Sequence, residues 1–134
     1  MTIQSACPCG SGEPYAACCL RFLEQRAEPK TAEELMRSRY SAFAKGHITY
    51  LKDTLWPRHQ AGFDAGATAK WAEDNHWTGL TVLATEAGRA GDRDGTVLFE
   101  ARYLAEGRLQ VHRELSRFRK KAGRWYYVEA LPEK

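Results

Sequence analysis

The sequence predicts an α+β fold in which helices come first and a meander of antiparallel strands follows. Helical patterns occupy the chain before residue 75, whereas apolar and polar residues alternate with a period of two from Trp77 onward. Short loops that contain glycine join these alternating segments, which indicates an antiparallel sheet rather than a doubly wound parallel one. With 134 residues, 43% of them hydrophobic, the chain is long enough for one domain with its own core and too short for two.

Three helices are expected ahead of the sheet. The first begins at Thr31, which forms a capping box with Glu34, and it ends at Gly46. A second helical stretch runs from residue 47 to 55 and ends at a Trp-Pro pair, and an alanine-rich third helix spans 64–75. Four strands are expected after them: 77–86, 96–104, 109–118 and 125–131.

The second and third strands form a hairpin whose register can be predicted. If Glu106 and Gly107 make a two-residue turn, Ala105 pairs with Arg108. One face then carries two opposed rows: Val97, Phe99, Ala101 and Tyr103 against Ser116, Glu114, His112 and Gln110. This mixture of apolar and polar groups is typical of a ligand pocket, so we expect this face to point toward the helices.

The first helix presents an apolar face with one charged residue in its middle. Leu35, Met36, Tyr40, Ala42 and Phe43 form that face, whereas Arg37, Ser38, Ser41 and Lys45 fall on the opposite side, which we expect to face solvent. Arg39 lies within the apolar face. A buried guanidinium requires a partner, and we expect that partner to be Glu114, or else Glu100. A structural ion pair that fixes the helix on the sheet would explain Arg39 equally well.

The cysteines give the clearest chemical signal. All four lie in the first 19 residues, at Cys7, Cys9, Cys18 and Cys19. Closely spaced thiolates suit a tetrahedral zinc ion or an iron–sulfur cluster, and the adjacent pair in a compact loop favours a single ion. We therefore expect one structural zinc ion per chain. With four protein ligands, the ion has no open position for catalysis, and its removal is expected to unfold this segment while leaving the rest intact.

Several segments resemble known families. Residues 7–19, Cys-Pro-Cys-Gly-Ser-Gly-Glu-Pro-Tyr-Ala-Ala-Cys-Cys, resemble the SEC-C zinc motif. Residues 35–43, 78–88 and 125–127 are similar to the YchJ family of bacterial proteins. The resemblance implies a nuclear-transport-factor-2-like cone, a curved antiparallel sheet packed on about three helices. It also implies two units, an N-terminal zinc lobe over residues 1–24 and the cone over residues 25–134.

Three functions are compatible with these features. In the favoured one, the N-terminal lobe docks a protein partner through Tyr15, Arg21 and Phe22, as the SEC-C resemblance implies, and the cone holds a small ligand. The alternative is a small-molecule enzyme of isomerase, dehydratase or hydrolase type, although the sequence contains no nucleophile motif. Its candidate pocket residues are Arg39, Tyr40, Phe99, His112 and Glu114, with His112 as general base and Glu114 orienting it. Residues two apart on a strand lie side by side, so these two side chains can converge on one ligand without a hydrogen bond between them.

Nucleic-acid binding is a third and less favoured possibility. Residues 101–125 contain eight basic and two acidic side chains, and Trp125 and Tyr127 could stack on bases. Charges on alternate residues of two solvated strands explain the same pattern more simply. The sequence shows neither an apolar run long enough to span a bilayer nor a secretory leader, so a cytoplasmic protein is expected. A homodimer through the sheet face that carries Leu98 and Leu115 is also possible by analogy with the fold.

Overall fold

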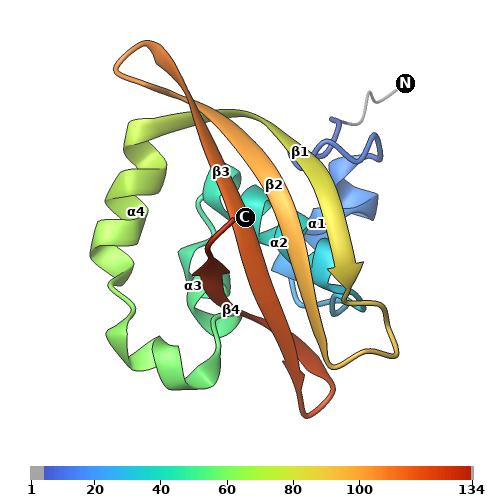
Figure 1. The fold of residues 1–134 in the computed structure, drawn as a ribbon. Coiled ribbons are helices and arrows are strands. Elements are labelled where there is room, and N and C mark those ends of the chain that lie inside the picture. Colours follow the sequence, from blue (N-terminus) through green and yellow to red (C-terminus); the bar gives the residue numbers. More distant parts are fainter. Residues whose placement is uncertain (1–4, 134) are drawn as a thin grey trace.

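The computed structural model describes residues 5–133, and it has the α+β architecture that the sequence predicts (Figure 1). Its helices, with two short 3-10 segments labelled η, are η1 Tyr15–Ala17, α1 Cys19–Leu23, α2 Ala32–Lys45, α3 Ile48–Asp53, η2 Pro57–Gly62 and α4 Ala65–Asp74. Its strands are β1 Asn75–Ala87, β2 Asp94–Ala105, β3 Arg108–Lys121 and β4 Arg124–Leu131. They form one antiparallel sheet in the order β1-β2-β3-β4.

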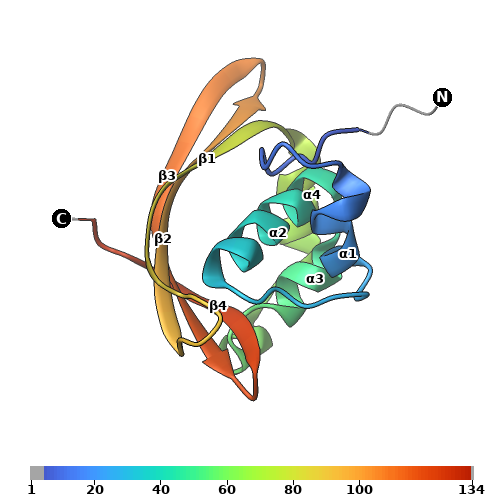
Figure 2. The ribbon, with the colours of Figure 1, turned by 90° about the vertical axis from the view of Figure 1, so that its right-hand side faces the viewer.

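The sheet curves around the helices, as the resemblance to a cone-shaped domain predicts. In the side view, α2 lies against the concave face of the sheet, and α1 and α3 lie on the side of α2 that faces away from it (Figure 2). Helix α2 contacts β1, β2, β4, α1 and α3, so it is the central element of the fold. No helix within residues 5–133 combines the length and the apolar character that a bilayer crossing requires.

Helix α2 begins and ends where the sequence predicts. The Thr31 side chain accepts a hydrogen bond from the backbone N–H of Glu34 at 3.1 Å, and Gly46 ends the helix in the left-handed conformation, with φ of 78°. The Glu34 carboxylate accepts from the N–H of Lys30 instead of completing the predicted capping box. One part of the face prediction is wrong, because Ser38 and Ser41 are fully buried. They are covered by α1, α3 and the cysteine loop, which enclose the second side of α2.

The predicted hairpin register is confirmed. Ala105 pairs with Arg108, Phe99 with Glu114 and Ala101 with His112 across β2 and β3. Val97, Phe99 and Ala101 are buried, as expected for the face that packs on the helices. The strands are longer than predicted by one to three residues at most of their ends, and irregularities in pairing interrupt β1 and the β3–β4 pair.

The N-terminal lobe shares its core with the cone. Cys7, Cys9 and Cys19 belong to the same buried cluster as residues of α2 and the sheet, among them Leu35, Tyr40, Leu80, Val97, Phe118 and Trp125. The N-terminal lobe therefore packs against the cone through a common set of buried side chains. Residues 1–4 and 134 of the two predicted units lie outside the described part of the chain.

Candidate metal centre and cone pocket

The four cysteines meet at one point. Their Sγ atoms all lie within 4.8 Å of one another, with 3.8 Å between Cys9 and Cys18 and 4.0 Å between Cys18 and Cys19. A tetrahedral ion with metal–sulfur bonds of about 2.3 Å keeps its ligands about 3.8 Å apart. The cluster thus has the size, the ligand number and the soft sulfur donors for one metal ion.

A tight loop places these thiols. The backbone N–H of Cys7 donates to the carbonyl of Glu13 at 2.9 Å, and that of Gly10 donates to the carbonyl of Cys7 at 3.2 Å. Gly10 and Gly12 have φ of 79° and 88°, a conformation that glycine adopts without steric cost. The chain then passes through η1 and enters α1, so the last two cysteines lie at the start of a helix.

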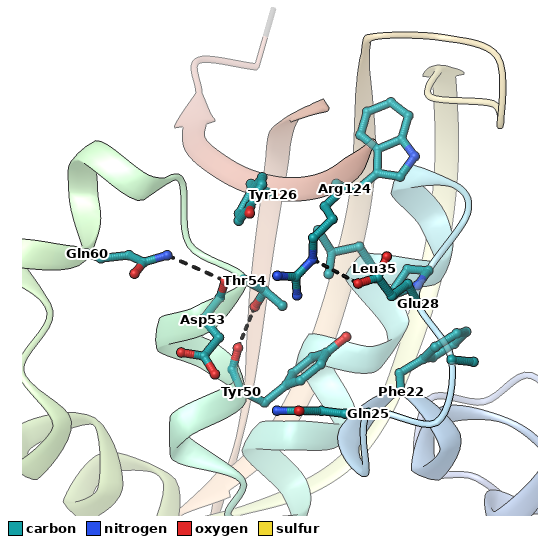
Figure 3. Close-up of a pocket in the computed structure, with 13 residues that line it drawn as sticks. Phe22, Gln25, Glu28, Leu35, Tyr50, Asp53, Thr54, Gln60, Arg124 and Tyr126 are labelled. Carbon is teal, nitrogen blue, oxygen red and sulfur yellow. Dashed lines mark hydrogen bonds and ion pairs between the residues drawn. The ribbon is translucent and has the colours of Figure 1, made fainter. Parts of the chain in front are cut away.

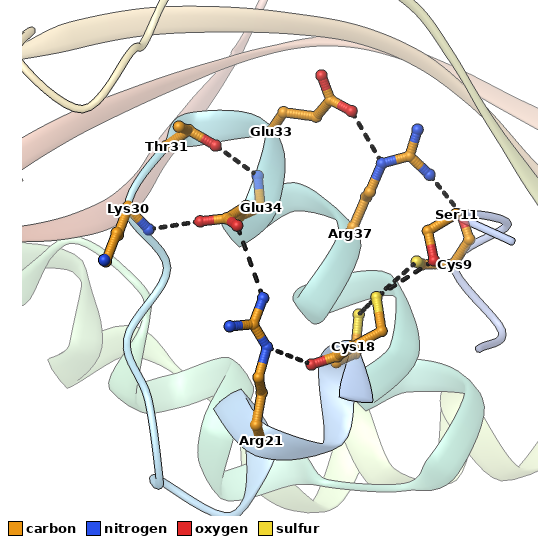
Figure 4. A network of polar contacts seen from close by, with 10 residues as sticks. Cys9, Ser11, Cys18, Arg21, Lys30, Thr31, Glu33, Glu34 and Arg37 are labelled. Carbon is orange, nitrogen blue, oxygen red and sulfur yellow. Dashed lines mark hydrogen bonds and ion pairs between the residues drawn. The ribbon is translucent and has the colours of Figure 1, made fainter. Parts of the chain in front are cut away.

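Two arginines tie the loop to its surroundings (Figure 4). The Arg37 guanidinium, from α2, donates to the backbone carbonyl of Cys9 at 2.7 Å. Arg21, from α1, donates to the carbonyl of Cys18 at 3.1 Å and lies 3.7 Å from the carboxylate of Glu34. Both arginines also bring positive charge toward a cluster that becomes negative when its thiols ionise.

The thiols compete for protons. Hydrogen bonds from Cys19 and Cys9 lower the pKa of Cys7, and the contact with Cys7 raises the pKa of Cys19. One thiolate is therefore favoured at the expense of its neighbours. All four can ionise together only when a cation compensates their charge, so the donor set fits a metal ion.

A pocket of about 280 Å³ lies between α2 and the sheet. The structure brings to it all five side chains that the sequence singled out: Arg39, Tyr40, Phe99, His112 and Glu114. Most of the remaining wall is apolar or aromatic, with Met36, Phe43, Trp71, Trp77, Ala101, Ser116 and Tyr127. The pocket is thus an aromatic cavity with a small polar cluster on one side.

The expected ion pair between Arg39 and a glutamate is not formed within the described residues. Arg39 instead donates through Nη1 to the carbonyl of Leu51 at 2.8 Å and to Oγ1 of Thr54 at 2.6 Å. Its guanidinium carbon lies 4.8 Å from the ring centroid of Tyr127, whose hydroxyl donates to Glu114 at 2.8 Å. The prediction failed because the end of α3 and an aromatic ring satisfy the guanidinium without a carboxylate. Burial lowers the pKa of Arg39 to about 10, so it remains charged at neutral pH.

Glu114 is the centre of the polar cluster. Its carboxylate lies 3.0 Å from Nε2 of His112 and accepts hydrogen bonds from the hydroxyls of Tyr127, at 2.8 Å, and Ser116. Burial acts to raise the pKa of Glu114, but these hydrogen bonds outweigh it and hold the pKa below its usual value. His112 and Glu114 therefore contact each other directly, because side chains two residues apart on a strand can lean toward each other.

The sequence analysis placed Ser116 on the pocket face with Glu114, but it missed Tyr127 as a neighbour of Glu114. Trp125 and Tyr127 are the two aromatic residues of the less favoured nucleic-acid hypothesis. Tyr127 lines the cone pocket, and Trp125 is buried in the core with 4% exposure. Counting pairs outward from the turn at residues 122–123 would have placed Tyr127 opposite Phe118, on the inner face. The number of residues between this turn and Tyr127 would therefore have been enough to predict that Tyr127 faces the pocket.

The three lobe residues named for partner docking differ in exposure. Phe22 is buried at 3% exposure, with the Arg21 guanidinium 4.3 Å from its ring centroid. Tyr15 is half-buried, and the ammonium group of Lys45 lies 5.0 Å from its ring. Of the three predicted residues, Arg21 offers the most usable contact. Phe22 was misplaced because the helix that carries it turns this side chain inward.

Comparison with known proteins identifies the family. The SEC-C motif matches residues 5–21, and the profile described as YchJ, middle NTF2-like domain matches residues 31–130. The chain belongs to the YchJ family. A relative from Chromobacterium violaceum named UPF0225 protein is 46% identical, over 96% of this chain and 93% of its own. A UPF0225 protein of Geobacter sulfurreducens is 44% identical, over 92% of this chain and 76% of its own.

Two solved structures share the YchJ-family fold seen here. The solution structure of a SEC-C motif containing protein from Rhodopseudomonas palustris superimposes with a TM-score of 0.88 at 36% identity, and covers 97% of this chain and all of its own. The crystal structure of a SEC-C motif containing protein from Psychrobacter arcticus has a TM-score of 0.82 at 30% identity, over 97% and 85% of the two chains. These likenesses extend over both the N-terminal lobe and the cone.

Proposed function

We propose that this YchJ-family chain is a zinc-stabilised binding protein whose ligand site is the cone pocket. Four thiolates at these distances suit a zinc ion best. Its ligands would be Cys7, Cys9, Cys18 and Cys19. A zinc ion with four protein ligands has no position for a substrate, so it supplies folding free energy and no reaction chemistry. The binding function must then reside elsewhere in the fold.

The observation that carries the proposal is the composition of the cone pocket. Ligand sites are mostly apolar cavities in which a few polar groups fix the orientation of the ligand. Here aromatic walls surround a polar cluster in which Glu114 already accepts three hydrogen bonds and His112 is half-exposed. A flat, largely apolar molecule with one polar group directed at His112 matches this arrangement.

Native mass spectrometry of the untagged protein, purified from a bacterial cytosol, tests this proposal. We expect one zinc ion and one small organic molecule per chain. In the variant Ala101→Phe the larger side chain fills the pocket, and we expect the zinc to remain and the small molecule to be absent. Val111→Phe is the matched control, since Val111 is exposed on the opposite side of the sheet. A wild-type protein that carries zinc alone would contradict the proposal, as would retention of the molecule by Ala101→Phe.

Docking of a protein partner through the N-terminal lobe has weaker support. Interfaces are anchored by large aromatic side chains and arginine, whereas the exposed lobe positions between Cys9 and Cys18 are Gly10, Ser11, Gly12, Glu13, Ala16 and Ala17. Arg21 is the anchor that this surface can offer. If the lobe docks a partner, Arg21→Ala should reduce its capture, while Arg108→Ala at the far end of the β2–β3 hairpin should not.

The contact between His112 and Glu114 supports a second candidate function, acid–base catalysis on the bound molecule. The Glu114 carboxylate, 3.0 Å from Nε2 of His112, can fix the orientation of the imidazole ring, and a positioned imidazole can move a proton to or from a bound molecule. Incubation of the protein with a bacterial metabolite extract tests this idea. An enzyme would deplete one metabolite and accumulate its product, and His112→Gln would abolish that change. Equal depletion by wild type and His112→Gln would rule out this role.

A further inference from the structure

A second cavity, of about 500 Å³, opens between the loop after α1, helix α3 and strand β4. Figure 3 shows Arg124 reaching from β4 into this space, beside Glu28 and toward Thr54 and Tyr50. The wall of this cavity includes the polar side chains of Gln25, Asp53 and Gln60. Arg124 and Tyr126 line it at the edge where β4 meets solvent.

The same edge carries a cluster of aromatic and basic side chains, which we call the basic–aromatic cluster. Its members are Trp56, Arg119, Lys121, Arg124 and Tyr126. Arg119 pairs with Tyr126 and Lys121 with Arg124 across β3 and β4, which places these four side chains on one face of the hairpin. Trp56 joins them because its backbone N–H donates to Tyr127 O at 2.8 Å, so its segment lies alongside β4.

Three cationic side chains lie close to the two rings of the basic–aromatic cluster. The guanidinium carbon of Arg119 and the ammonium nitrogen of Lys121 lie 5.3 and 5.6 Å from the Trp56 ring centroid. The guanidinium carbon of Arg124 lies 5.8 Å from the Tyr126 ring, and the two rings meet edge to face at 5.9 Å. Both aromatic side chains are half-buried, so they remain partly accessible to solvent.

Positive charge exceeds negative charge at this end of the hairpin. Residues 117–124 contain five basic side chains and no acidic one. Their carboxylate partners are Asp94, Glu129 and Glu28, and Lys121 has no ion pair within the described residues. These pairs lie at the surface, where an ion pair contributes little and a phosphate can replace a carboxylate at low cost.

We propose that the basic–aromatic cluster binds single-stranded nucleic acid. Unpaired bases stack on Trp56 and Tyr126, and the phosphates between them contact Arg119, Lys121 and Arg124. Duplexes fit less well, because their bases are not free to stack on protein rings. An acidic peptide could meet the cations but would leave the two rings without a function. The adjoining 500 Å³ cavity, which shares Arg124 and Tyr126 with the cluster, gives space for one unstacked base.

Fluorescence anisotropy of labelled 12-nucleotide oligouridylate and oligodeoxythymidylate tests the proposal with the zinc-loaded, full-length protein. We expect binding of at least one strand at low salt. Its affinity should fall with salt, with a log–log slope of about −2 for three phosphate contacts, at roughly −0.7 each for single strands. A preference between the two strands would show whether RNA or DNA is the ligand, because both share the chemistry that the cluster recognises.

Variants separate stacking from charge. Removing one stacking ring by Trp56→Ala should weaken binding roughly five- to 150-fold, and Trp56→Phe should restore much of it. Lys121→Gln should weaken binding and reduce the steepness of the salt slope by about 0.7. Arg108→Gln removes an equally exposed cation from the other end of β3 and should leave binding unchanged.

Three outcomes would overturn the proposal. One is absence of binding at 50 mM salt, and another is an equal loss for Lys121→Gln and Arg108→Gln, which would indicate unspecific attraction. The third is displacement of the oligonucleotide by polyglutamate at the same charge concentration, since a polyanion without bases would then suffice. That result would identify the cluster as a site for acidic protein segments. None of these outcomes bears on the cone pocket.

Discussion

Gly10 and Gly12 differ in how much the cysteine loop depends on them. Both have positive φ, so alanine at either position costs about 1 kcal/mol in backbone strain. A Cβ on Gly10 would also lie 3.1 Å from the backbone oxygen of Leu80 in β1, whereas a Cβ on Gly12 meets open space. We therefore expect Gly10→Ala to lower the free energy of unfolding by about 2 kcal/mol, and Gly12→Ala by about half as much. Equal urea midpoints for the two variants would show that the contact with β1 is unimportant.

Glu114 should make a pH-dependent contribution to stability. Because its pKa is lowered in the folded protein, the ionised form is favoured by folding, and this stabilisation is present above its ordinary pKa of 4.5. It is lost as the pH falls through the lower, folded-state pKa. We expect Glu114→Gln to lower the free energy of unfolding by about 1–3 kcal/mol at pH 7, because the amide cannot accept the same three hydrogen bonds.

Urea unfolding at pH 7 and at several values below 4.5 measures this effect. The difference between wild type and Glu114→Gln should narrow as the pH falls, because the wild-type carboxyl then becomes neutral as well. Glu73→Gln, at an exposed position of α4, is the control and should differ little from wild type at any pH. A gap between Glu114→Gln and wild type that stays constant with pH would contradict the prediction.

Residues whose chemistry is local were the easier ones to predict. The spacing of the four cysteines was enough to predict a metal site, and the structure brings their thiols together. The partner of Arg39 could not be read in the same way, because a backbone carbonyl, a hydroxyl and the face of Tyr127 satisfy it. Carbonyl groups are present at every residue, so no pattern in the sequence marks the one that accepts a buried guanidinium.

At the scale of elements, α2 depends on its N-cap. Thr31 accepts the backbone N–H of Glu34, which otherwise has no partner in the first turn. We expect Thr31→Ala to lower the free energy of unfolding by about 1 kcal/mol, and Thr31→Ser, which keeps the hydroxyl, to cost much less. Thermal unfolding followed by circular dichroism measures both. A Thr31→Ser variant as unstable as Thr31→Ala would mean that the lost methyl group, and not the cap, is responsible.

The elements and their pairing were largely predictable because short turns fix the register of hairpins. The turn at Glu106 and Gly107 set the whole β2–β3 ladder, and the residue pairs around the pocket followed from it. The burial of Ser38 and Ser41 was not predictable from α2 alone. A helix covered on two sides can bury a polar side chain where the second covering element supplies a hydrogen-bond partner. Here the Tyr50 hydroxyl lies 2.7 Å from Oγ of Ser38, and Sγ of Cys7 lies 3.6 Å from Oγ of Ser41.

At the scale of the whole molecule, the cysteine cluster and the cone share one buried core. The buried cysteines contact the same core as α2 and the sheet, and Arg37 bonds the cysteine loop to α2. The sequence alone suggested a lobe that unfolds separately, because the cysteines are grouped in the first 19 residues and the strands lie far along the chain. The spacing of the cysteines does not indicate which distant residues cover them, so the shared core could be recognised only from the structure.

Removal of the metal should therefore destabilise the entire domain. Without a cation, at most some of the buried thiols can ionise, the loop loses its crosslink, and the core around Leu35, Leu80 and Trp125 loses one wall. We expect a zinc chelator, or the double variant Cys9→Ser and Cys18→Ser, to lower the midpoint of one single unfolding transition. Near-ultraviolet circular dichroism and amide chemical shifts across β1–β4 would follow it. If only the signals of residues 5–23 changed while the strands kept their native shifts, the lobe would be an independent unit and the shared core would carry no coupling.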